Sequence, residues 1–151
     1  RIIRTIDWKI FVMDKVLIDT DVILDFLFDR KPFSEDAAQI LSWCENSKIQ
    51  GFVTSIVLSN IYYLLRKTAK HEKVIENLKM LLNIVDVITT NKDTVLDALH
   101  SEFKDFEDAL QNFSAQNHDE IKVIITRNIK DYKRSNLVVM EPETYINLVK
   151  I

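Results

Sequence analysis

Aspartates stand at three separate places in this sequence where a strand ends or a helix begins. Asp19 directly follows the short run Lys15–Ile18, which is typical of a buried strand. Asp105 and Asp108 open a segment whose apolar residues recur at helical spacing, so both are expected near a helix start. Asp131 comes a few residues after a β-branched strand. Three segments of the chain are therefore expected to contribute acids to one polar site.

This set of side chains favours the binding of Mg²⁺ or Mn²⁺. Both ions prefer carboxylate oxygens and keep several of their waters. An ion held by aspartates can generate hydroxide and stabilise both oxygens of an in-line attack on a phosphodiester. A zinc site is not expected, because the three histidines are scattered and only one cysteine is present. A phosphate-binding P-loop or a glycine-rich dinucleotide turn is excluded, because the chain has a single glycine.

Each aspartate also has a structural interpretation that the residues alone leave open. Asp19 suits the N-cap of the helix that follows it. Asp105 and Asp108 suit the first turn of a helix, where negative charge complements the helix dipole. Asp21 is expected to be a first-turn charge, and Asp25 is expected at a solvated helix position.

Short apolar strands that alternate with longer amphipathic helices position these acids. The predicted strands are residues 15–18, 52–54, 84–87, 122–126 and 137–139. The predicted helices are residues 21–28, a segment capped by Ser34 and followed by a loop that Gly51 closes, a segment capped by Ser55, residues 71–82, 91–101 and 105–117, and a last one from Pro142. This alternation predicts an α/β fold, a three-layer α/β/α sandwich around a mostly parallel five-stranded sheet. Ligands of such sheets bind outside the carboxyl ends of the strands.

The composition is that of one ordinary globular domain. Apolar residues make up 47% and charged residues 28% of the chain, which excludes a disordered protein. The net charge of −3 gives no general attraction to nucleic acid, so RNA binding needs a local basic patch. The lone Cys44 favours a reducing, cytoplasmic compartment, and no apolar run approaches the ~20 residues of a membrane span. Residues 1–12 are interpreted as an extension, either upstream of a native start at Met13 or an N-terminal strand, with the domain covering residues 13–151.

Four segments of the chain resemble, in order, the segments that carry the acids of PIN domains. Lys15–Asp25 is similar to the opening strand and first metal aspartate of that family. Asp105–Gln111 resembles the helix with the third acid, and Ile124–Tyr132 resembles the segment with the fourth. Met140–Tyr145 is similar to the short strand and helix that close the fold. The resemblance runs from about Met13 to the C-terminus.

The resemblance implies that Asp19, Asp108 and Asp131 hold Mg²⁺ or Mn²⁺ and that Asp105 is an additional catalytic acid. The residues implied to contact substrate or border the site are Thr20, Asn60, Thr126, Arg127 and Asn128. The basic residues expected to contact phosphates near the site are Arg127, Lys130, Lys133 and Arg134. The implied function is a metal-dependent endoribonuclease for single-stranded RNA or tRNA, often the toxin of a VapBC-type pair. A homodimer and capture by an antitoxin protein are implied as well.

One position departs from the family pattern and keeps other functions open. Asn60 stands where the family has glutamate, and an amide oxygen coordinates a cation without contributing charge. Metal affinity is therefore expected to be lowered, and the alternative is a degenerate PIN domain that binds RNA or a protein without cutting. A third hypothesis is a haloacid-dehalogenase-like phosphatase, based on Asp19-Thr-Asp21 and Thr54. That family also needs a lysine and an acid pair after a later strand, where this chain has Arg127-Asn128.

Overall fold

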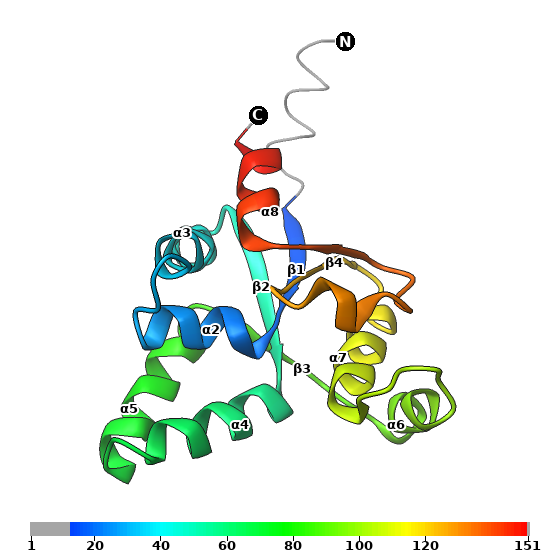
Figure 1. The fold of residues 1–151 in the computed structure, drawn as a ribbon, viewed down its shortest axis with the longest axis horizontal. Helices are drawn as coiled ribbons and strands as arrows, with labels where there is room; N and C mark the ends of the chain where they lie inside the picture. Colours follow the sequence, from blue (N-terminus) through cyan, green and yellow to red (C-terminus); the bar gives the residue numbers. More distant parts are fainter. Residues whose placement is uncertain (1–12, 151) are drawn as a thin grey trace.

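A single five-stranded sheet forms the centre of the computed structural model, which describes residues 13–150 (Figure 1). The strands are β1 (Asp14–Ile18), β2 (Ile49–Thr54), β3 (Asp86–Ile88), β4 (Ile121–Ile125) and β5 (Val138–Met140). Their order in the sheet is β3-β2-β1-β4-β5, and every pair of neighbours is parallel. The sequence predicted a mostly parallel five-stranded sheet, and the sheet is parallel throughout. The expected extension of residues 1–12 lies outside the described residues.

Seven α-helices and one short 3₁₀-helix connect and cover these strands within residues 13–150 (Figure 1). The helices are α2 (Thr20–Leu27), α3 (Ser34–Glu45), α4 (Ser55–Arg66), α5 (His71–Leu82), α6 (Lys92–Leu99), α7 (Phe106–Gln116), the 3₁₀-helix η1 (Ile129–Tyr132) and α8 (Pro142–Val149). No helix in this part of the chain has both the length and the apolar character needed to cross a bilayer.

The core is divided between the two faces of the sheet, because successive side chains of a strand point to opposite faces. Val16 and Ile18 belong to a large hydrophobic cluster with residues of α2, α3, α4, α5 and α8. Leu17, between them, belongs to a second cluster with Ile124 of β4 and Ala115 of α7. Helices therefore cover both faces, which confirms the predicted three-layer α/β/α sandwich.

Several predicted boundaries differ from the structure. Gly51 lies inside β2 rather than in the loop before it, and a Cβ there would lie 2.7 Å from Cys44 Sγ and 2.9 Å from Ile18 Cδ1. Glycine at this position therefore allows α3 to pack closely on the sheet. The N-cap of α4 is Thr54 rather than Ser55, because the Thr54 hydroxyl accepts a hydrogen bond from the Val57 N–H (3.2 Å).

Two further boundaries were also misplaced. The position before α3 is Phe33, which makes no side-chain capping bond, and Ser34 is the first helical residue. Strand β3 begins two residues later than predicted, at Asp86.

The sheet grows in one direction from β1 and later in the opposite direction, so β1 is the switch point of the strand order. From β1 the chain proceeds to β2 and β3 on one side, and it then returns to place β4 and β5 on the other. The carboxyl ends of β1 and β4 meet where the Asp19 N–H donates to the Ile125 carbonyl (3.0 Å). Such a switch point is where ligands of parallel sheets bind.

Candidate active site

Asp19 occupies this switch point and is both a helix cap and a buried acid. Its side chain is 6% exposed at the N-cap of α2. The carboxylate accepts hydrogen bonds from the Thr20 N–H (2.8 Å), the Thr126 hydroxyl (2.8 Å) and the Gln111 amide (2.5 Å). Burial raises the pKa of Asp19, and these three donors counteract the increase. The Thr20 hydroxyl itself is buried and has no hydrogen-bond partner within residues 13–150.

Asp21 joins the segment after β4 to the start of α2. Its Oδ2 accepts hydrogen bonds from the Arg127 N–H (3.0 Å) and the Asn128 side-chain amide (3.1 Å). Its Oδ1 is buried and lacks a hydrogen-bond partner in the described part of the chain. Burial, and then the charge of Asp19, raise the pKa of Asp21 to about 6. Asp21 is therefore a member of the acidic site in addition to its first-turn position.

Asp108 lies in the first turn of α7 and shares its surroundings with other acids. Its backbone N–H donates to Asp105 Oδ1 (2.9 Å), so Asp105 is the N-cap of this helix. Burial first, and then the charges of Asp105, Asp19 and Asp131, raise the pKa of Asp108 to about 7. Asp19 and Asp131 are therefore close enough to act electrostatically on Asp108.

A depression of about 260 Å³ opens beside these acids. Its lining consists of Glu102, Phe103, Lys104, Asp105, Asp108, Lys130, Asp131, Lys133 and Arg134. One set of lining residues is acidic. The basic set consists of Lys130 in η1, Lys133 and Arg134 directly after η1, and Lys104 before α7. An anionic ligand bound here would therefore contact cationic groups while its reacting atom faced carboxylates.

The donors at this site fit a hard divalent cation in kind. They are all carboxylate oxygens. The Oδ1 of Asp21 accepts no hydrogen bond within the described residues, so its lone pairs are available to a cation. Burial, and then neighbouring like charges, raise the pKa of Asp21 and Asp108, and a bound cation would relieve the repulsion between these charges. Within residues 13–150, however, no three His, Cys, Asp or Glu side chains are already placed to hold an ion. Binding would therefore draw the carboxylates together.

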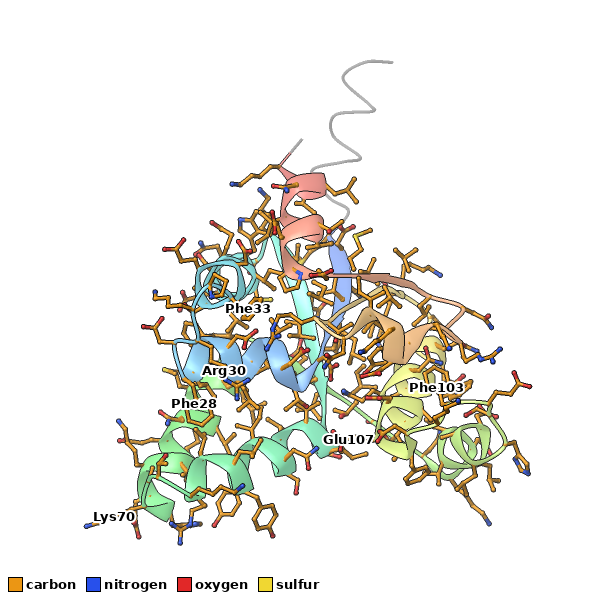
Figure 2. All side chains as sticks on the ribbon, viewed as in Figure 1. Phe28, Arg30, Phe33, Lys70, Phe103 and Glu107 are labelled. Carbon is orange, nitrogen blue, oxygen red and sulfur yellow. The ribbon has the colours of Figure 1, made fainter. Side chains whose placement is uncertain are left out.

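Arg127 does not line the depression. Its Nε and Nη2 donate to Asp25 at 2.6 and 3.0 Å, and its guanidinium lies 3.9 Å above the Phe33 ring. Asp25 is 1% exposed and also pairs with Arg30 (3.5 Å), and Figure 2 shows Phe33 and Arg30 on the side of α2 and α3. The expectation that Asp25 is solvated was wrong, because Arg127 compensates its charge across 102 residues of sequence.

Asn60 has an acidic partner that the sequence did not reveal. Its side-chain amide on α4 donates to Glu107 Oε1 on α7 at 2.6 Å. Glu107 lies between these two helices in Figure 2. It was visible in the sequence only as one more acid at a helix start, because its partner is 47 residues away.

Gln111 is a second residue that the sequence analysis missed. It is fully buried. Its amide nitrogen donates to Asp19 Oδ1 (2.5 Å), and its carbonyl oxygen accepts from the Thr54 hydroxyl (3.2 Å). The one local signal was its spacing of three from Asp108, which places both on the same face of α7.

Comparisons with known proteins agree with this arrangement. A family model described as the PIN domain matches residues 15–130. Ribonuclease VapC1 of Aquifex aeolicus (strain VF5) is 27% identical over 137 residues, covering 87% of this chain and 93% of that protein. A chain of a toxin–antitoxin complex from Klebsiella pneumoniae is 25% identical with a TM-score of 0.63, covering 84% of this chain and 97% of its own. A chain of VapBC2 from Rickettsia felis, solved with promoter DNA, is 18% identical with a TM-score of 0.63 and the same coverage.

This chain belongs to the PIN domain family. Its similarity to a VapC ribonuclease and to chains of VapBC complexes confirms the resemblance that the sequence suggested. The haloacid-dehalogenase-like hypothesis loses its support, because the family match covers the strand, the helix and the loop on which that hypothesis depended.

Proposed function

We propose that this protein is a metal-dependent endoribonuclease of the VapC type. The observation that carries the proposal is the convergence of acids from three distant segments beside the buried carboxylate of Asp19. Asp19, Asp108 and Asp131 would hold Mg²⁺ or Mn²⁺, with Asp105 as an additional acid that also caps α7. An ion bound there supplies an activated water and neutralises charge that develops on the scissile phosphate.

The residues around these acids hold them in place. Thr126 and the Thr20 backbone orient the Asp19 carboxylate through their hydrogen bonds, which also counteract the effect of burial on its pKa. The Asn128 side-chain amide likewise orients the Asp21 carboxylate. In this proposal Arg127 is a positioning residue rather than a phosphate contact, because its guanidinium fixes the loop after β4 to Asp25.

The basic side of the depression is suited to the backbone of single-stranded RNA or tRNA. Lys104, Lys130 and Lys133 line it, and Arg134 pairs only loosely with the exposed Glu102 (3.5 Å). Lysine and arginine contacts to phosphates position a nucleic acid without reading its bases.

An antitoxin protein, a homodimer and a cytoplasmic location belong to the same proposal. The support for an antitoxin is that similar chains occur in VapBC complexes. The support for a reducing compartment is that Cys44 is buried and free. This protein is co-purified with the product of the gene beside its own. Size-exclusion chromatography with light scattering then tests the partner and the dimer together.

The direct test is cleavage of a labelled single-stranded RNA by the full chain with Mn²⁺ and with EDTA. We expect cleavage only with the metal, and a loss of at least about 100-fold in Asp19→Asn and Asp108→Asn. The matched control is Asp93→Asn, which changes a first-turn aspartate of α6 outside the site. Full activity of the Asp108→Asn protein would overturn the proposal.

The second candidate function is RNA or protein binding without cleavage. Asn60 favours it, because an amide replaces the carboxylate expected at that position of the family. An RNA that binds the wild-type chain equally with and without Mn²⁺, and remains intact, would establish this candidate in place of the nuclease.

A further inference from the structure

The contact between Asn60 and Glu107 links the one position that departs from the family pattern to a carboxylate. The amide nitrogen of Asn60 donates a hydrogen bond to Glu107 Oε1 at 2.6 Å. Both side chains are partly buried. Figure 2 shows Glu107 between α7 and α4. The bond fixes one carboxylate oxygen of Glu107 and leaves the other for a different partner.

The charge of Glu107 is not neutralised by a neighbouring base. Among residues 13–150, no lysine, arginine or histidine lies within 4.0 Å of its carboxylate. Glu107 also directly precedes Asp108 in the first turn of α7, so the two carboxylates lie at the same helix end. A cation at the acids would compensate Glu107 as well as Asp108.

The two positions are also complementary in charge. A glutamate at position 60 would place a second carboxylate against Glu107, and two carboxylates at hydrogen-bond distance repel strongly. With an amide at position 60, the pair carries one negative charge and one hydrogen bond. The carboxylate of this pair lies on α7, and the amide lies on α4.

We propose that Glu107 is the fourth carboxylate of the metal site and that Asn60 is a positioning residue that holds it. This inference rests on the proposed function, because it assumes that Asp19, Asp108 and Asp131 bind a divalent ion. It also removes the reason to regard the site as weakened by Asn60. The competing explanation is that Glu107 only complements the dipole of α7, in which case Asn60 and Glu107 have no effect on metal binding.

The test is the affinity of the full chain for Mn²⁺, measured by calorimetry and by the electron paramagnetic resonance of free Mn²⁺, without RNA. We expect Glu107→Gln to weaken binding by at least about tenfold and Asn60→Ala by about three- to tenfold. The control is Glu72→Gln, which removes an exposed first-turn glutamate of α5 and should leave the affinity unchanged. Melting curves in EDTA verify that each variant is folded.

A charge exchange makes the test sharper. In Asn60→Glu/Glu107→Gln the carboxylate moves back to α4 and the amide to α7, so we expect affinity within about threefold of the wild type. The inference is wrong if Glu107→Gln binds Mn²⁺ like the wild type while Asp108→Asn does not bind it. If the wild type and Asp108→Asn both fail to bind Mn²⁺, the proposed function fails, and this inference fails with it.

Discussion

Replacing Gln111 with leucine should destabilise the protein and should do so more strongly at high pH. Gln111 is fully buried and donates to the Asp19 carboxylate at 2.5 Å while accepting from Thr54 at 3.2 Å. A hydrogen bond to a charged group contributes about 1.5–3 kcal/mol and a neutral one about 1 kcal/mol. Leucine has a similar volume but removes one hydrogen bond from the Asp19 carboxylate and one from the Thr54 hydroxyl, so we expect a loss of about 2–4 kcal/mol in the free energy of unfolding.

The pH dependence follows from the pKa of Asp19. Burial already raises this pKa, and the bond from Gln111 is among the contacts that lower it. Without that bond the folded-state pKa rises further above the unfolded value. An acid shifted in this direction contributes stability at low pH that is lost as the pH rises through its folded pKa. The destabilisation should therefore be larger at pH 8 than at pH 5.

Urea denaturation in EDTA at these two pH values measures both effects. The control is Gln116→Leu, the same substitution on the same helix at a side chain without a hydrogen bond in the described structure. We expect Gln116→Leu to change the free energy of unfolding by less than about 0.5 kcal/mol. A loss below about 1 kcal/mol in Gln111→Leu, or an equal loss at both pH values, would refute the reasoning.

Three further predictions concern the wild type and two other sites. The pKa values of Asp21 and Asp108 are raised to about 6 and about 7. In EDTA the melting temperature of the wild type should therefore fall as the pH rises from 5 to 8, and saturating Mn²⁺ should abolish this fall. Arg127→Met leaves the buried Asp25 without its main partner, and urea denaturation should show a loss of about 3–5 kcal/mol. Gly51→Ala places a methyl group 2.7 Å from a side chain of α3, and we expect a loss of about 1–3 kcal/mol by the same method. If either variant is as stable as the wild type, the stabilising role that we assign to Arg127 or the close packing that we assign to Gly51 is wrong.

The sequence predicted those features that local patterns encode. Strand β4 was visible as a β-branched run, and Asp19 was visible because an acid follows a short apolar strand. The order of four family-like segments then predicted the fold, which the family match confirms. The roles of the individual acids remain predictions.

The side-chain pairs were not predictable in this way. Arg127 meets Asp25 across 102 residues, Gln111 meets Asp19 across 92, and Asn60 meets Glu107 across 47. Periodicity shows which face of an element is apolar, but it does not show which polar side chains from two elements meet. Asp25 was misjudged for this reason, since an isolated acid on a helix is usually solvated.

The position of β4 beside β1 has a consequence for when the site can exist. Strand β2 pairs with both β1 and β3, and all three precede β4 in the sequence, whereas Thr126 reaches Asp19 across 107 residues. At a synthesis rate of ~5–20 residues per second, roughly 5–20 seconds separate these residues on the ribosome. A nascent chain therefore carries an incomplete acidic centre throughout that interval. Any activity that depends on the centre can begin only after β4 has entered the sheet.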